Sequence, residues 1–347
     1  MRQNLLDDLK IIHLRDKSDA LGVAEKQTLQ LNQKYEVNFT SNQEIKNIIV
    51  AGMGGSGWPA WYLRSWPGVK VPFEVVNDYI LPHYAGIDSL VIISSFSGNT
   101  EETISALDNA KKCGAQIVVM TTGGSLAEQA VSENIPMLKI PSCTQPRMST
   151  FYFLAAQIEL LEKLKLIKEG IQSELSKVTD WLNDELNQWT ATVPTSKNLA
   201  KQLALDMVGK SPVIYAGPTL GPVARKWKIC INENAKNIAW WNVLPEFNHN
   251  EFIGWSSHPV DKPYCIIDLR SKLDHQRIQK RFEVTEKMLS GIRPATHSVI
   301  VHGETILKQL LWASVLGDFV SIYLAILNNV DPTPVDLVEK FKIALDQ

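Results

Sequence analysis

Short runs of aliphatic and β-branched residues alternate with helical patterns along most of the 347-residue chain. In the first half, the runs are typical of buried strands and the patterns between them are typical of helices. The expected strands are 47–52, 72–76, 90–94, 116–121 and 137–140, and the expected helices are 58–65, 101–112 and 126–134. Strands that alternate with helices form a parallel sheet with helices on both faces. We therefore expect an α/β fold with a doubly wound sheet in three layers.

The same alternation returns in the second half of the chain. The pattern over residues 150–192 is almost purely helical. After it, strands are expected at 212–216, 235–240, 264–268 and 298–301, followed by a long apolar helix at 305–328. The halves look like one architecture used twice. We expect an N-terminal helix and a first domain over residues 1–165, a helical linker over 166–195 and a second domain over 196–347.

Composition and charge limit the class of partner. Hydrophobic residues make up 45% of the chain, charged residues 21%, and the net charge is −2. These values are typical of a globular protein. A nucleic acid or an anionic membrane requires a basic surface, so neither is expected as a partner. A small anionic ligand needs only a few local donors and stays possible.

Three sequence features favour a cytoplasmic protein. The first 17 residues alternate charged and apolar positions, which predicts an amphipathic helix rather than a signal peptide. We expect no membrane span, because we expect every apolar run to fall short of the roughly 20 residues that cross a bilayer. The four cysteines form no CxxC pair, which is typical of buried thiols in a reducing compartment.

A glycine-rich turn follows the first expected strand. Residues 52–57 read GMGGSG and precede a helical pattern. Glycines let the backbone approach an anion closely, and a helix that follows offers free N–H groups. The spacing also matches the GxGxxG pattern of dinucleotide-binding folds, with Asp78 as the acidic residue that binds the ribose. This turn alone therefore leaves a phosphate site and a dinucleotide site open.

A second turn favours the phosphate site. Residues 94–103 read SSFSGNTEET and place three hydroxyl groups around one glycine. A single Ser or Thr at a helix start is usually an N-cap. Three of them predict a cup for a terminal phosphate, which accepts many hydrogen bonds. A dinucleotide turn needs no such cup. The expected phosphate-binding residues are Gly54, Gly55, Ser56, Ser95, Ser97 and Thr100.

With three further segments, these turns resemble the sugar isomerase (SIS) domain family and, within it, the bifunctional phosphoglucose/phosphomannose isomerases. The segments are 146–149 (PRMS), 232–236 (NENAK) and 246–251 (EFNHNE). The resemblance runs from about residue 45 to the C-terminus. It implies two SIS-type domains joined by long helices and an isomerase of sugar 6-phosphates. The activity expected is interconversion of glucose 6-phosphate, and also mannose 6-phosphate, with fructose 6-phosphate through a cis-enediol.

Such an isomerase needs a base for the proton transfer, a cation or donor for the enediolate and an acid/base group for ring opening. The resemblance assigns the base to Glu233, which alone would be interpreted as a solvated helix residue. It assigns enediolate stabilisation to Arg147. Ring opening falls to His249, supplied by the other subunit of a homodimer, and to Lys342, with Lys340 as a close alternative. No cofactor and no metal is expected.

Other functions stay open. A non-catalytic phosphosugar-binding regulator would keep the two turns and could dispense with the catalytic residues. An aminosugar or heptose phosphate isomerase would use related domains, and an NAD-dependent oxidoreductase is a more distant alternative. The turn after the first strand of the second domain, residues 216–222, contains two prolines that lack amide donors. We therefore expect only the first domain to bind phosphate.

Overall fold

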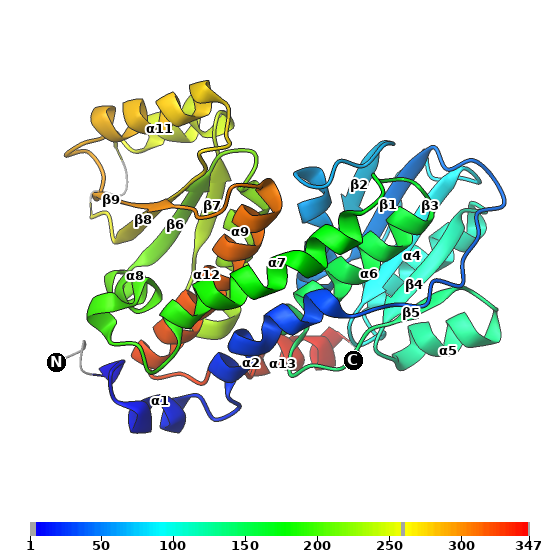
Figure 1. The fold of residues 1–347 in the computed structure, drawn as a ribbon, viewed down its shortest axis with the longest axis horizontal. Coiled ribbons are helices and arrows are strands. Elements are labelled where there is room, and N and C mark those ends of the chain that lie inside the picture. Colours follow the sequence, from blue (N-terminus) through cyan, green and yellow to red (C-terminus); the bar gives the residue numbers. More distant parts are fainter. Residues whose placement is uncertain (1–4, 258–260, 346–347) are drawn as a thin grey trace. The chain divides into compact units, whose positions relative to one another are not determined.

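The structure is a computed structural model that describes residues 5–257 and 261–345 (Figure 1). The chain divides into two compact units. Residues 26–183 form the first unit, and residues up to 25 together with those from 184 onward form the second. The N-terminal helix, which the sequence assigned to the first domain, therefore groups with the second half of the chain. There the Asp7 carboxylate accepts a hydrogen bond from the Thr195 amide (2.8 Å), and the Arg15 guanidinium donates to the Ile326 carbonyl (2.6 Å).

The first unit contains a five-stranded parallel sheet in the order β2-β1-β3-β4-β5 (Figure 1). Its strands are β1 (Asn47–Gly52), β2 (Phe73–Val76), β3 (Ser89–Ser95), β4 (Gln116–Thr121) and β5 (Met137–Lys139). Every strand expected from the sequence is confirmed to within two residues. The three inner strands, β1, β3 and β4, are mainly β-branched and aliphatic runs because both of their faces are buried. One of those faces packs with α4 and α5 into a core of aliphatic side chains.

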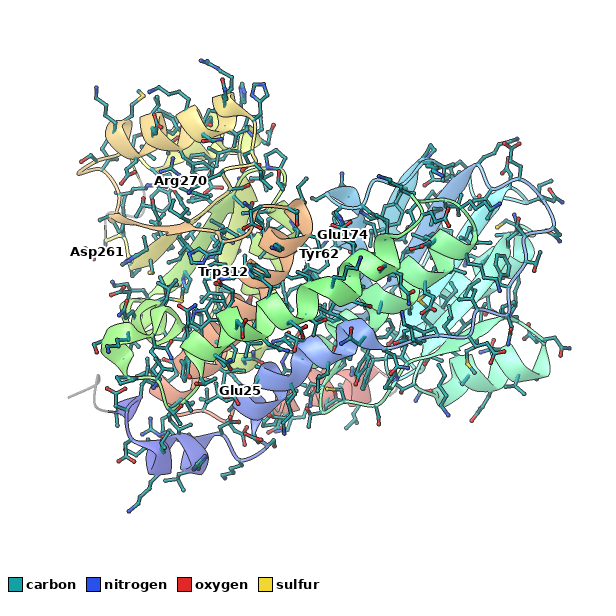
Figure 2. The ribbon with its side chains drawn as sticks, in the orientation of Figure 1. Glu25, Tyr62, Glu174, Asp261, Arg270 and Trp312 are labelled. Carbon is teal, nitrogen blue, oxygen red and sulfur yellow. The ribbon has the colours of Figure 1, made fainter. Side chains whose placement is uncertain are left out.

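The helices of the first unit follow the alternating pattern. They are α3 (Gly54–Gly57), the 3-10 helix η3 (Trp58–Arg64), α4 (Glu101–Lys112), α5 (Gly124–Ser132), the 3-10 turn η4 (Pro146–Met148) and α6 (Thr150–Lys163). Helix α7 (Ile171–Leu186) crosses from the first unit to the second. Tyr62 of η3, labelled in Figure 2, is almost fully buried. Its ring meets that of Trp58 edge-on, with ring centres 4.4 Å apart.

The second unit contains a four-stranded parallel sheet in the order β7-β6-β8-β9. Its strands are β6 (Ser211–Ala216), β7 (Trp240–Val243), β8 (Tyr264–Arg270) and β9 (Thr296–Ile300). The helices are α1 (Leu9–Arg15), α2 (Ala20–Lys26), α8 (Leu199–Met207), α9 (Gly221–Ala235), α10 (Glu251–Gly254), α11 (Gln276–Met288), α12 (Ile306–Leu327) and α13 (Asp336–Leu345).

The strand expected at 235–240 is wrong. Helix α9 continues through Ala235, since Ile231 and Ala235 complete its buried face. Lys236 then ends the helix in the left-handed conformation, with φ 50°. The strand β7 starts only at Trp240. The apolar composition of residues 235–240 fits the end of a helix as well as the start of a strand, so it could not distinguish the two.

Helix α12 contradicts the expectation that no segment could span a bilayer. It has 22 residues, and its most apolar window has a mean hydropathy of 2.0. That window is entirely buried within the protein. Trp312, labelled in Figure 2, is one of its buried residues. The Trp312 indole N–H donates to the Glu185 carboxylate (2.7 Å), and its ring stacks on that of His302, with ring centres 4.7 Å apart. Burial on all sides accounts for the composition of this helix.

Candidate phosphate-binding turns and catalytic segments

Both turns singled out in the sequence lie at the carboxyl ends of β1 and β3. These strands are neighbours, with Gly52 opposite Ser94. The strand order reverses between them, and ligands of open α/β sheets bind at such a switch point. Two hydrogen bonds join the turns: the Ser94 hydroxyl donates to the Ser56 carbonyl (2.8 Å), and the Phe96 amide donates to the Ser56 hydroxyl (2.8 Å). Ser56 therefore holds the two turns together and keeps its own hydroxyl proton for an acceptor.

The hydroxyl groups of the second turn are not helix caps. Thr100 is the N-cap residue of α4, yet its side chain makes no cap hydrogen bond. Its hydroxyl lies 3.0 Å from that of Ser95, which also accepts from the Gly98 amide (3.1 Å). The Ser97 hydroxyl accepts from the Asn99 amide (3.2 Å) and is exposed. One proton of the Ser95–Thr100 pair and that of Ser97 stay available, as an anionic ligand requires.

A third turn, which the sequence reasoning missed, supports the second one. Residues 122–125 (TGGS) follow β4. Gly98 has φ 72°, and a Cβ there would lie 1.8 Å from the Gly123 carbonyl oxygen. The Ser125 amide donates to the Asn99 side chain (2.9 Å). The glycine and hydroxyl residues directly after a strand resemble the first turn, so the same pattern could have found this one.

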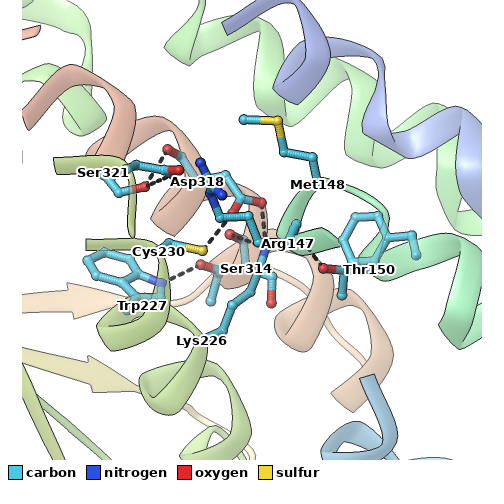
Figure 3. Close-up of polar contacts among 12 residues, drawn as sticks. Arg147, Met148, Thr150, Lys226, Trp227, Cys230, Ser314, Asp318 and Ser321 are labelled. Carbon is cyan, nitrogen blue, oxygen red and sulfur yellow. Dashed lines mark hydrogen bonds and ion pairs between the residues drawn. The ribbon is translucent and has the colours of Figure 1, made fainter. Parts of the chain in front are cut away.

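Arg147 belongs to the turn η4 that follows β5. A Cβ on Gly55 would lie 2.6 Å from the Arg147 backbone nitrogen, so η4 packs directly on the first turn. The Thr150 hydroxyl donates to the Arg147 carbonyl (2.9 Å; Figure 3), and the guanidinium lies 3.4 Å from the Gln145 amide oxygen. The first unit thus gathers every expected phosphate-binding residue and Arg147 around one end of its sheet.

Glu233 lies in the last turn of α9 and is half-buried. Lys236 organises this helix end. Its ammonium group donates to the carbonyls of Asn234 (3.2 Å), Asp331 (2.5 Å) and Pro332 (3.2 Å). A cation at a helix C-terminus is favourable because the carbonyls there carry partial negative charge. Lys236 therefore ties the helix end that carries Glu233 to the segment that leads into α13.

Both candidate lysines lie on α13 and are exposed. Lys342 forms an ion pair with Glu339 at 2.9 Å, one turn earlier on the helix. Among the residues that the structure describes, Lys340 has no ion-pair partner. The choice between the two lysines stays open.

His249 ends the 3-10 turn η7 (Glu246–His249), and its side chain is exposed. Within 5–257 and 261–345, no group bonds to its imidazole. Its two preceding neighbours are held by contacts. The side-chain amide of Asn248 donates to the Thr285 hydroxyl (2.9 Å), and the ring of Phe247 packs on that of Tyr215, with ring centres 4.6 Å apart. The segment therefore presents a free imidazole from a fixed backbone.

A buried polar cluster joins α9 and α12, and the sequence reasoning did not predict it (Figure 3). Lys226 forms an ion pair with Asp318, and the Cys230 thiol donates to the same carboxylate (3.3 Å). Burial first, and then the charge of Asp318, raise the pKa of Cys230 well above its usual value. A lone Asp within the apolar α12 sequence was the available signal, because a buried charge needs a partner.

The corresponding turn of the second sheet is filled by the protein itself. It follows β6, beside β8, at the point where this strand order reverses. A Cβ on Gly217 would lie 2.1 Å from the carboxylate of Asp274, which is buried. Burial raises the pKa of Asp274, and hydrogen bonding to Thr219 partly offsets the rise. A carboxylate thus occupies the space where an anion would approach this turn.

No group of three or more His, Cys, Asp or Glu residues in the described part of the chain is arranged to hold a metal ion.

Known proteins similar to this chain define its family. Residues 196–345 match the family model described as the bacterial phospho-glucose isomerase C-terminal SIS domain. A bifunctional phosphoglucose/phosphomannose isomerase from Caldicellulosiruptor bescii is 36% identical over 322 residues, which cover 90% of this chain and 95% of that protein. One from Aquifex aeolicus is 32% identical over 300 residues, which cover 86% and 89%.

A solved structure extends the likeness to the fold. The crystal structure of a glucose-6-phosphate isomerase like protein from Thermus thermophilus superimposes with a TM-score of 0.65 at 17% identity, over 96% of this chain and 99% of that one. Two relatives are more than 30% identical to this chain over most of its length, so the similarity extends beyond the fold. The chain therefore belongs to the bifunctional phosphoglucose/phosphomannose isomerase family.

Proposed function

We propose that the protein is an aldose–ketose isomerase that interconverts glucose 6-phosphate and mannose 6-phosphate with fructose 6-phosphate. The observation that carries the proposal is the pair of hydroxyl-lined turns at the switch point of the first sheet. They offer several O–H donors to one terminal phosphate. The relatives named above, which are called bifunctional phosphoglucose/phosphomannose isomerases, support this substrate class.

In this proposal the chain is a tandem of two SIS-type domains joined by long helices, with boundaries near residues 165 and 195. Only the first domain binds phosphate, through Gly54, Gly55, Ser56, Ser95, Ser97 and Thr100. The Asp274 carboxylate beside the turn after β6 supports this asymmetry, since it would repel a phosphate. The substrate class and the free thiols of all four cysteines fit a cytoplasmic location.

The chemistry follows from what each side chain can do. Glu233 removes the proton at C2 of the open-chain aldose and returns it to C1, which yields the ketose through a cis-enediol. A carboxylate within hydrogen-bond reach of both carbons suits this transfer. Arg147 offers the planar, fork-shaped donors of a guanidinium and stabilises the negative enediolate oxygen.

Ring opening precedes the proton transfer. It requires that a proton leaves the C1 hydroxyl and another reaches the ring oxygen. His249 suits this exchange because imidazole both accepts and donates a proton near neutral pH. Lys342 is the second ring-opening group in the proposal, with Lys340 as its alternative.

The dual specificity has a stereochemical reason. Glucose 6-phosphate and mannose 6-phosphate differ only at C2, which becomes planar in the shared enediol. A base that reaches C2 from either side of that plane forms both aldoses from one intermediate.

A coupled assay tests the proposed function. The purified protein is given glucose 6-phosphate and mannose 6-phosphate, and the fructose 6-phosphate formed is measured. Glucosamine 6-phosphate serves as the comparison substrate. We expect turnover of the first two at rates typical of enzymes, above about 1 s⁻¹. Turnover of the amino sugar alone would indicate an aminosugar isomerase, and binding without any turnover would indicate a regulatory module.

The homodimer and the exchange of His249 between subunits are also part of the proposal. The exposed, unbonded imidazole of His249 supports it. We expect His249→Ala and Glu233→Gln each to be strongly impaired, with only residual activity, when expressed separately. When the two variants are co-expressed, about half of the dimers are mixed, and one of the two sites in each mixed dimer has both native residues. About a quarter of wild-type activity should therefore return. A mixture as inactive as the two variants alone would mean that His249 serves its own subunit.

A further inference from the structure

The carboxylate of Glu251 lies two residues after His249 and is bonded at both oxygens to the sheet of the second unit. One oxygen accepts the phenolic O–H of Tyr215, on β6. The other accepts the side-chain amide of Asn242, on β7, at 2.7 Å. Tyr215 and Asn242 are register partners on adjacent parallel strands. One side chain therefore holds the segment to two strands at once.

Tyr215 is suited to be a permanent donor. It is 1% exposed. Burial first, and then the charge and hydrogen bond of Glu251, raise the pKa of Tyr215 far above its usual value, so the phenol keeps its proton. The Trp255 indole donates to the same phenolic oxygen (3.2 Å), and the Arg293 guanidinium lies 5.4 Å from the centre of the ring. Tyr215 thus links Glu251 to the core of the unit.

Hydrogen bonds within residues 246–251 also hold the backbone on both sides of His249. The Asn250 side chain donates to the Glu246 carboxylate (2.5 Å) and accepts from the Glu251 amide (2.6 Å). Every neighbour of His249 in this turn is therefore bonded or packed, while the imidazole itself is exposed. An acid/base group must lie within hydrogen-bond reach of the proton that it moves. Because no described side chain holds the imidazole, its position depends on the backbone that Glu251 fixes.

We propose that Glu251, held by Tyr215 and Asn242, is the positioning residue that sets His249 for ring opening. This inference rests on the proposed function of His249. Glu251 touches no reacting atom and acts only through the placement of the His249 backbone.

Glu251→Gln tests the inference, because the amide keeps the size and loses one acceptor. Tyr215→Phe is the second variant, since it removes the donor and leaves the ring in the core. We expect each to lower kcat by about tenfold or more, while KM and inhibition by glucitol 6-phosphate, an acyclic ligand that needs no ring opening, change less than about twofold. Glu283→Gln, an exposed carboxylate of α11, is the matched control and should leave kcat unchanged.

A double-mutant cycle separates positioning from a general structural role. In a His249→Ala background, Glu251→Gln should lower kcat by less than about twofold further, because the two residues act in one step. Near-ultraviolet circular dichroism checks that each variant is folded. Two outcomes would overturn the inference, provided that His249→Ala is impaired. One is an equal loss of kcat from Glu251→Gln in the wild-type and His249→Ala backgrounds. The other is wild-type kcat for both Glu251→Gln and Tyr215→Phe. Wild-type kcat for His249→Ala itself would instead overturn the role of His249 in the proposed function, and the inference with it.

Discussion

The carboxyl group of Asp268 lies in the interior of the second unit, on β8, and is 2% exposed. Burial raises its pKa to about 7, against the opposing charges of Arg293 and Arg270. Arg270 also lies over the ring of Phe282 from α11, at 5.4 Å from the ring centre. Asp268 therefore holds a proton in the folded protein at pH values where an exposed carboxyl group has lost it.

Asp268 makes the stability of the protein depend on pH. The unfolded chain releases this proton near the usual pKa of 3.8, and the folded chain keeps it up to about pH 7. The free energy of unfolding that Asp268 contributes therefore falls as the pH rises between these values. We expect the melting temperature of wild type, relative to Asp268→Asn, to fall steadily from pH 4 to pH 7. Thermal melts of both proteins across this range check it, and a constant difference would mean that Asp268 is ionised throughout.

Single residues were also where the sequence carried the least information. Glu233 and His249 can be singled out only through the family resemblance, because a Glu or His at a helix end is usually solvated. The bonds of Glu251 reach Tyr215, 36 residues earlier in the sequence, and Asn242, 9 residues earlier, on two adjacent strands. No local pattern encodes such a contact, because it depends on the order of the strands.

At the scale of elements, the proposed phosphate site depends on three turns that pack against one another. Gly98 is the tightest contact, since any side chain there would meet the Gly123 carbonyl. Its left-handed φ of 72° adds a second reason for glycine. The second and third turns can therefore keep their spacing only with glycine at this position.

The substitution Gly98→Ala should disrupt the proposed phosphate site. The added Cβ pushes the second turn away from the third, so we expect KM for fructose 6-phosphate to rise about tenfold or more. Gly170→Ala is the matched control, because Gly170 also has a positive φ, of 88°, but no atom lies within 4 Å of the added carbon. Steady-state kinetics of both variants check the prediction. Equal and small changes in KM would show that the turn spacing does not matter for binding.

The elements of the first sheet could be predicted because each buried strand is a short continuous apolar run between polar turns. The prediction was wrong where two elements share an apolar run, as at 235–240, where α9 ends and β7 has not begun. The apolar length of α12 was also underestimated from the sequence pattern. This helix is long and apolar enough to span a membrane, yet its most apolar window is buried within the protein. In both cases packing partners distant in sequence decided the outcome.

At the scale of the whole molecule, the two sheets share the order of their first four strands, but different residues lie at the point where that order reverses. Each sheet reverses its strand order beside its first strand. In the first unit the turns there carry glycine and hydroxyl groups, and in the second Asp274 packs against the turn. In the proposal, the first unit binds phosphate and contributes Arg147, while the second supplies Glu233 and His249.

The proton transfer that defines this function can be observed directly. Wild type and Glu233→Gln are incubated with fructose 6-phosphate in D₂O, and the products are followed by proton NMR. Because a base exchanges protons with solvent, the account predicts that wild type forms both glucose 6-phosphate and mannose 6-phosphate with deuterium at C2, whereas Glu233→Gln binds the sugar phosphate and forms neither. Aldose products without any deuterium at C2, or labelled products from Glu233→Gln at the wild-type rate, would contradict it.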